Sequence, residues 1–319
     1  MNRFAIICSL AASILVTQAG SQQAGSQQAP VFRGATAIVP VFVTVTDKAG
    51  RLVTTLTRDD FTVLDNGRPQ AISVFDNSPQ PLHLIEMLDV SGSMYGNYPL
   101  LRSASEQLFA RLRPDDQARV GSFGSTISIS PTFTHDASEL MAAVPASGNE
   151  SAPTPLWTAL NEALDGLKGI EGRRVVLVLS DGKDTGPLKF GQGFLTGPQI
   201  GVRAQNDDVM IYAVGLRSRS SARARAFNMA NMGNSLADDL PDPGLSQLAL
   251  ETGGGYFEIE PRDDLGATFT RAVDELHSQY LLGFAPPDRD GKRHKIEVRL
   301  RPHDLTPRAR KNYLAPKAS

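Results

Sequence analysis

The feature that most constrains the fold is an uninterrupted aliphatic run at residues 175–179, which lies within a long alternation of strand-like and helix-like patterns. Such a run is typical of a strand that is covered on both faces, as in a parallel sheet. Further apolar strand patterns occur at residues 82–88, 118–123, 209–216 and 255–259. Helical spacing of apolar residues occurs between them, at 100–112, 138–144, 158–167, 245–250 and 265–276. Strands that alternate with helices predict an α/β fold with a doubly wound, mostly parallel sheet over residues 82–278.

The segments on either side of this region have the character of antiparallel strands. Positions 38–45 are largely apolar, and the tight-turn sequence Asp65-Asn66-Gly67 precedes a return through Ile72, Val74 and Phe75. Strand patterns at 280–284 and 296–300 follow the α/β region. Neither flank is large enough to bury a core alone. We therefore expect residues 31–81 and 279–319 to pack together as one small β-sandwich-like module.

The N-terminus predicts export. Arg3 precedes a largely apolar run at residues 4–16, and the small residues Thr17 and Ala19 follow. We interpret residues 1–19 as a signal peptide and 20–30 as a flexible leader, with an uncleaved anchor as the alternative. Cys8 is the only cysteine of the chain. The mature protein would then have no disulfide or thiol chemistry, and we expect it to be secreted or periplasmic, in the cell envelope.

The overall charge excludes some partner classes. The formal net charge of the 319 residues is -2, and 41% of them are hydrophobic. Neither half of the chain is strongly basic, which argues against nucleic acid or an anionic membrane as the main partner.

Polar side chains follow the predicted strands where a ligand site is expected. Ligands of open α/β sheets bind beyond the carboxyl ends of the strands. Asp89, Ser91 and Ser93 follow the first strand, Asp181 follows the aliphatic run, and Thr154 precedes a helix between them. Carboxylate and hydroxyl oxygens are hard donors that suit Mg²⁺, Mn²⁺ or Ca²⁺ rather than Zn²⁺. Since only two carboxylates would face a doubly charged ion, the cation should attract one further anionic oxygen, such as a carboxylate from a partner.

The order Asp89-Val90-Ser91-Gly92-Ser93, then Thr154, then Asp181 resembles the metal-ion-dependent adhesion site of von Willebrand factor A domains. The resemblance spans roughly residues 82–276 and implies a Rossmann-like sheet with a divalent cation, Mg²⁺ being favoured. It further implies that Ser91, Ser93 and Thr154 ligate directly, and that Asp89 and Asp181 act directly or through water. It also implies that a protein or peptide with an acidic residue binds at the cation.

The flanks are similar to a bacterial subgroup of von Willebrand factor A-related proteins that is abundant in acidobacteria. The resemblance is carried by residues 43–47 (VTVTD), 59–63 (DDFTV), 279–284 (QYLLGF) and 308–313 (RARKNY). Asn312 departs from this pattern, in which glycine often occupies that position. The resemblance implies an exported protein of mostly unassigned role.

Two segments that follow strands should border the site and shape its specificity, residues 186–201 and 217–241. The first offers apolar Phe190, Phe194 and Leu195. The second offers a basic cluster, for which a solvated helix face is the alternative. Its members are Arg217, Arg219, Arg223 and Arg225. We expect Trp157 to pack beneath the site and Asp184 to be a solvated loop residue.

Two alternatives to a binding protein stay open. The first is an Mg²⁺-dependent enzyme similar to haloacid dehalogenase-like phosphatases, which resemble this chain in an aspartate at the end of the first strand. That chemistry requires a second aspartate two residues later, where this chain has Ser91, and a serine cannot act as a general acid or base at neutral pH. The second alternative is a scaffold in which the metal only pins loops together. Because Ser91 stands where the enzyme would need this second aspartate, we expect no enzymatic activity.

Overall fold

The computed structural model describes residues 38–188, 193–217, 241–260 and 263–317. The predicted signal peptide and leader, residues 1–30, lie outside this part of the chain. Among the described residues, no helix is both long enough and apolar enough to cross a bilayer.

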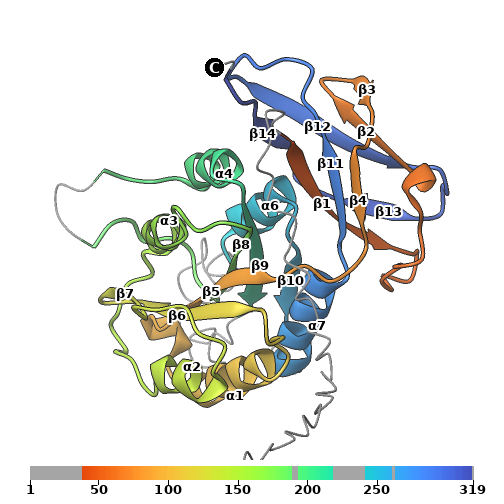
Figure 1. The fold of residues 1–319 in the computed structure, drawn as a ribbon. Coiled ribbons are helices and arrows are strands. Elements are labelled where there is room, and N and C mark those ends of the chain that lie inside the picture. The colour runs from red at the N-terminus through yellow and green to blue at the C-terminus, as the bar shows by residue number, and fades with distance from the viewer. Residues whose placement is uncertain (1–37, 189–192, 218–240, 261–262, 318–319) are drawn as a thin grey trace, which may run out of the picture.

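The centre of the fold is a six-stranded sheet in the order β10-β9-β8-β5-β6-β7 (Figure 1). Its strands are β5 (Leu82–Asp89), β6 (Gln117–Phe123), β7 (Ile127–Ile129), β8 (Arg173–Ser180), β9 (Val209–Leu216) and β10 (Tyr256–Ile259). All neighbours are parallel except β7, which pairs antiparallel with β6 at the edge. The predicted α/β class with a mostly parallel sheet is confirmed.

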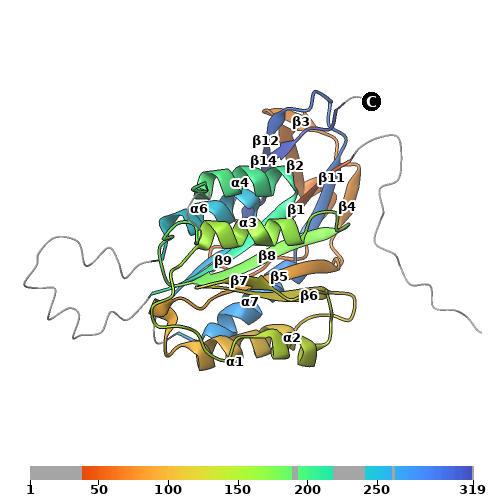
Figure 2. The same cartoon turned by 90° about the vertical axis from the view of Figure 1, so that its left-hand side faces the viewer.

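Helices cover both faces of this sheet (Figure 2). One face carries α1 (Tyr98–Phe109), α2 (Ala137–Ala143) and α7 (Leu265–His277), and the other carries α3 (Leu156–Gly166), α4 (Gly197–Asn206) and α6 (Pro243–Thr252). Alternate residues of the aliphatic run enter different cores. Val175 and Leu177 pack with the first set, whereas Val176 and Val178 pack with the second. This explains why the run has no polar face.

Helix α4 is not among the helices that the sequence predicts. It starts within residues 186–201, the segment that was expected to border the site. The helix begins with a capping box, in which the Thr196 side chain accepts from the N–H of Gln199 and the Gln199 side chain accepts from the N–H of Thr196. This Thr-x-x-Gln pattern is a sequence signal for a helix start that could have located α4. The last five residues of this segment, 197–201, are therefore helical.

The two flanks form the second module as a pair of four-stranded antiparallel sheets, ordered β13-β1-β11-β4 and β14-β12-β2-β3. The strands are β1 (Val39–Thr46), β2 (Phe61–Asp65), β3 (Arg68–Gln70), β4 (Val74–Asp76), β11 (Tyr280–Phe284), β12 (Arg293–Leu300), β13 (Thr306–Arg308) and β14 (Asn312–Leu314). N-terminal β1 and β2 pair with C-terminal β11 and β12. Inward residues such as Val41, Val63 and Ile296 share one core.

The predicted course after the first tight turn is wrong in one respect. Asn66 and Gly67 do form the turn, with φ values of 48° and 80°. The strand that returns is β3, however, and the segment with Val74 and Phe75 crosses to the other sheet, where β4 pairs with β11. The three-residue length of β3 and its Pro69 gave no strand pattern in the sequence.

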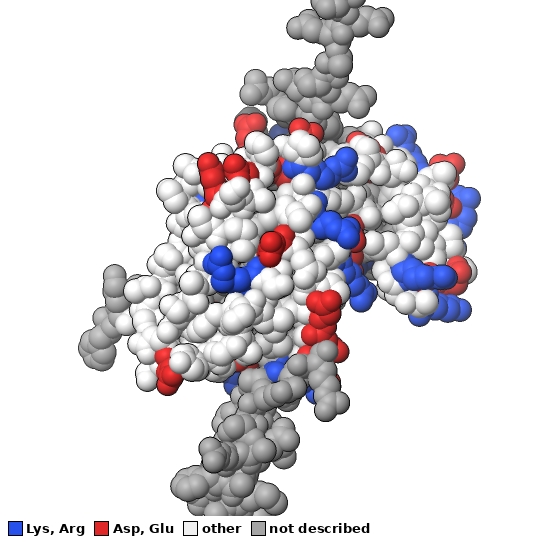
Figure 3. All heavy atoms as spheres, turned by 90° about the horizontal axis from the view of Figure 1, so that it is seen from below, with Lys and Arg blue, Asp and Glu red and all other residues white. Residues whose placement is uncertain are grey.

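The module packs at the amino ends of β8 and β9, so that it and the carboxyl ends of these strands lie at opposite ends of the sheet (Figure 2). Gln279 donates to the Thr44 hydroxyl at 2.7 Å, and Arg308 pairs with Glu275 of α7. Seen from below, positive and negative side chains are scattered over the surface, and neither sign forms a continuous patch on this face (Figure 3).

Candidate metal-binding site

Asp89 is the last residue of β5 and is fully buried. One carboxylate oxygen accepts from the backbone N–H of Ser91 at 2.8 Å, and the other accepts from the hydroxyl of Ser180 at 2.5 Å. Burial raises the pKa of Asp89 to about 6, although these hydrogen bonds oppose the shift. No cationic side chain is bonded to this carboxylate in the described part of the chain, so its charge is poorly compensated.

Ser91 and Ser93 lie on the short turn that follows β5. Ser91 directly precedes the 3-10 helix η2 (Gly92–Met94), and Ser93 lies within it. Their hydroxyl oxygens are 3.1 Å apart. The Ser93 hydroxyl also donates to a carboxylate oxygen of Asp181 at 2.6 Å. The turn after β5 is thereby joined to the loop after β8, as expected for neighbouring parallel strands.

Asp181 follows directly after β8 and is 1% exposed. Its Oδ2 atom is buried and has no hydrogen-bond partner among the described residues. Burial, followed by the negative charge of Asp89, raises the pKa of Asp181 to about 7. An orphaned carboxylate oxygen beside a second buried carboxylate is an unfavourable arrangement unless a cation joins it.

Thr154 approaches the same point from the loop before α3. A Cβ atom placed on Gly182 would lie 3.2 Å from the Thr154 hydroxyl oxygen and 3.7 Å from that of Ser93. The hydroxyls of Thr154 and Ser93 thus border one small space, which the absence of a side chain at Gly182 leaves open. The backbone of Thr154 is fixed by two hydrogen bonds of 2.9 Å with Thr185.

The structure thus brings together all five residues that the sequence singled out, from three separate loops. They present two carboxylates and three hydroxyls, a set of hard oxygen donors that fits Mg²⁺, Mn²⁺ or Ca²⁺. Within this set, the buried Oδ2 atom of Asp181 has no hydrogen-bond partner among the described residues, so it is the atom that most clearly calls for a cation. This site has only two carboxylates, and nowhere in the described ranges does a group of three or more His, Cys, Asp or Glu side chains have the arrangement to hold a metal.

Two further residues support the site and were missed or misjudged from the sequence. Buried Ser180 holds Asp89 through its hydroxyl, which also accepts from the N–H of Gly182 at 3.3 Å. A polar residue that ends an aliphatic strand was the available signal. Asp184 is not simply solvated, because it accepts from the N–H of Trp157 at 3.1 Å and from that of Gly186 at 2.9 Å. It therefore ties this loop to the start of α3.

Gly92 is required by the close approach of the loop that leads to Thr154. A Cβ atom on Gly92 would lie 2.0 Å from the carbonyl oxygen of Glu150, and the N–H of Gly92 donates to the carbonyl of Ala152 at 3.0 Å.

We expect Gly92→Ala to push this loop away and weaken Mg²⁺ binding at least about tenfold, with a loss of stability of about 1–3 kcal/mol. Titration calorimetry measures the binding. Gly193→Ala is the control, because nothing lies within 4 Å of its Cβ position. Unchanged affinity in Gly92→Ala would contradict this role.

The predicted specificity segments are described in part. Phe194 is 75% exposed, whereas Leu195 packs against the core beneath α3 and α4. Arg217 is paired with Glu258 and Glu260, which favours the solvated, ion-paired alternative for this residue. Trp157 is buried in the same core, as expected. Residues Phe190, Arg219, Arg223 and Arg225 lie outside the described residues.

Comparison with known proteins agrees with this topology. Residues 84–183 match the model of the von Willebrand factor type A domain. No curated protein matches the chain.

Several solved structures resemble the chain at low sequence identity. An aerotolerance-related membrane protein from Bacteroides fragilis is 14% identical, with 61% of this chain and 98% of that chain covered and a TM-score of 0.42. Proximal thread matrix protein 1 from the mussel byssus is 16% identical over 75% of this chain and 50% of that chain, with a TM-score of 0.45. The ArnB paralog VWA2 from Sulfolobus acidocaldarius is 15% identical over 87% and 76%, with a TM-score of 0.42. Similarity at this level carries no information on function.

Proposed function

Because this chain carries a von Willebrand factor type A domain, we propose that it is a binding protein that holds a protein or peptide partner through a divalent cation, Mg²⁺ being favoured. The observation that carries the proposal is the convergence of Asp89, Ser91, Ser93, Thr154 and Asp181 at the carboxyl ends of β5 and β8. We further propose an exported location, which rests on the apolar N-terminal segment seen in the sequence.

The donor set suggests how a partner would be recognised. Ser91, Ser93 and Thr154 would supply neutral oxygens to the cation, and Asp89 and Asp181 would supply its negative charge directly or through water. When bound, the cation would supply a Lewis acid with only two anionic groups of the protein near it, so that it can accept an additional anionic oxygen. A glutamate or aspartate of the partner provides such an oxygen. No catalytic step is assigned to the protein.

The test is capture of envelope proteins on the immobilised full chain. We expect captured protein to be released by EDTA and retained again when Mg²⁺ is restored, because the partner's carboxylate would bind to the protein only through the ion. A soluble glutamate-containing peptide should compete, and its glutamine analogue should not. Asp89→Ala should capture nothing, since one of the two carboxylates at the ion is lost, whereas the exposed Asp115→Ala should behave as the wild type.

Two outcomes would contradict the proposal. Capture that persists unchanged in excess EDTA would separate partner binding from the metal. A metal-dependent rise of the melting temperature without any metal-dependent capture would indicate a scaffold, in which the ion only joins the three loops.

A further inference from the structure

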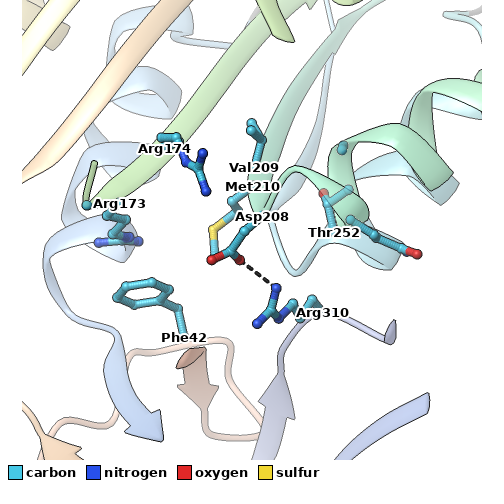
Figure 4. A pocket seen from close by; sticks show the side chains of 11 residues that line it. Phe42, Arg173, Arg174, Asp208, Val209, Met210, Thr252 and Arg310 are labelled. Carbon is cyan, nitrogen blue, oxygen red and sulfur yellow. Dashed lines mark hydrogen bonds and ion pairs between the residues drawn. The ribbon is translucent and has the colours of Figure 1, made fainter. Parts of the chain in front are cut away.

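A pocket bordered by charged side chains lies at the opposite end of the sheet from the metal-binding site, between the α/β domain and the β-module (Figure 4). It is lined by the first residues of β8 and β9 on one side and by β1 and the segment before β14 on the other. Three guanidinium groups border it, from Arg173, Arg174 and Arg310, but its wall contains only one carboxylate, that of Asp208. The lining therefore carries an excess of positive charge.

Arg173 is buried without a carboxylate partner among the described residues. Its guanidinium donates to the carbonyl of Leu276 at 2.5 Å and to the side chain of Gln279, and it lies 4.7 Å from the centre of the Phe42 ring. These partners are neutral, and its Nε atom has no partner. Burial lowers the pKa of Arg173 to about 10, so the group stays charged at neutral pH. The charge of Asp116 acts on Arg173 through space, but no carboxylate is bonded to it. A buried cation with only neutral hydrogen-bond partners is unfavourable, and a nearby anion would relieve it.

The side chain of Arg174 makes no hydrogen bond or ion pair with any described residue, and its buried Nε also has no partner. Figure 4 shows its guanidinium directed toward Asp208 and Met210 across the pocket. Its charge also contributes, after burial, to lowering the pKa of His83, which is the nearby titratable group on β5. Arg174 is thus a cation with free donors at the mouth of the pocket.

Asp208 is already used by the third arginine. Its carboxylate pairs with Arg310 at 2.5 Å, and Arg310 also donates to the carbonyl of Pro40 at 2.5 Å. Asp208 adopts a left-handed conformation with φ of 53° directly before β9. Asp208 offsets only one of the three guanidinium charges, and the buried Nε of Arg310 has no partner among the described residues, so the pocket keeps an excess of positive charge.

We propose that this pocket binds a small oxyanion, such as phosphate, sulfate or a free carboxylate, through Arg173, Arg174 and Arg310. The planar fork of a guanidinium matches two oxygens of such an anion, which a single-atom anion cannot offer. The cavity has a volume of about 20 Å³, room for one or two water-sized groups, so a tetrahedral oxyanion would place one or two of its oxygens inside and leave the others toward solvent. Since the arginines come from both modules, the anion would hold the β-module on the α/β domain.

Thermal unfolding of the full chain in EDTA tests the site without contribution from a divalent ion. We expect sodium phosphate to raise the melting temperature by several degrees above sodium chloride of equal ionic strength. Titration calorimetry with phosphate should give a saturable heat. Parallel titrations with sulfate and acetate identify which oxyanion geometry binds most tightly.

Arg174→Gln is the decisive variant, because this side chain makes no hydrogen bond or ion pair with any described residue. It should unfold as the wild type does in chloride, and its affinity for phosphate should fall at least about tenfold. Arg174→Lys, which keeps the charge but loses the fork, should bind with intermediate affinity. The control is Arg299→Gln, at an exposed ion pair with Glu297 on β12. Equal stabilisation by chloride and phosphate, or full phosphate affinity in Arg174→Gln, would overturn the proposal.

Discussion

In the absence of metal, Asp181→Asn is expected to melt several degrees above the wild type, and Mg²⁺ is expected to leave its melting temperature unchanged. The wild type buries two carboxylates next to each other, and Oδ2 of Asp181 has no partner. An amide removes one of these charges and can still accept from Ser93, so it relieves about 2 kcal/mol of unfavourable burial. The same change removes a charge that a cation needs. Stability and metal binding should therefore change in opposite directions.

Scanning calorimetry in EDTA and in Mg²⁺ measures both effects on the same sample. In the wild type, Mg²⁺ should raise the melting temperature, because only the folded chain brings the three loops together. Asp115→Asn is the matched control, since Asp115 is exposed and lies outside the site. A metal-dependent rise that survives in Asp181→Asn would remove this residue from the ion, and a lower melting temperature in EDTA would show that its charge is compensated.

The free energy of unfolding is expected to fall by about 3 kcal/mol more in the wild type than in Glu86→Gln between about pH 5 and about pH 8. Glu86 lies in the middle of β5, fully buried, and accepts one hydrogen bond from Ser105 at 2.8 Å. Burial raises its pKa from 4.5 to about 8. The folded chain thus binds a proton that the unfolded chain releases, so this contribution is complete below pH 4.5 and is lost as the pH rises through 8.

Urea unfolding in EDTA at each pH gives this difference. Comparing the two proteins removes the contributions of Asp89 and Asp181, which titrate in both. Glu106→Gln is the control, because Glu106 is exposed on the same helix as Ser105. Parallel pH profiles for the wild type and Glu86→Gln would mean that Glu86 is not held neutral by its surroundings.

The parts of the fold that could be predicted are those with strong local patterns. The run at 175–179 indicated a strand covered on both faces, and the polar residues after two neighbouring strands were expected to meet because parallel strands end at the same edge. The side-chain support of Asp89 by Ser180 was not predicted, since it depends on which way a single hydroxyl points. The turn at Asn66-Gly67 was visible, but the partner of β4 was not, because pairing with β11 is set by distant residues.

The pocket between the modules has no signature in the sequence. The presence of arginine alone indicates no site. Two of the arginines are adjacent in the sequence, and the third is distant from them in the sequence. Only the docking of the β-module brings Arg310 to Asp208, which are 102 residues apart. Charge clusters assembled from such distant positions depend on the tertiary arrangement and cannot be inferred from local spacing.

Because strands from both flanks form one β-sandwich, this module can complete its folding only late in synthesis. Strand β1 finds its partners only in the C-terminal strands β11 and β13, and contacts such as that between Thr44 and Gln279 span 235 residues. During synthesis, the N-terminal strands must therefore keep open edges until residues 280–308 have left the ribosome, or have crossed a membrane if the protein is exported. Exposed strand edges are prone to mispairing. We therefore expect truncation before β11 to yield aggregates, even where the α/β domain itself remains intact.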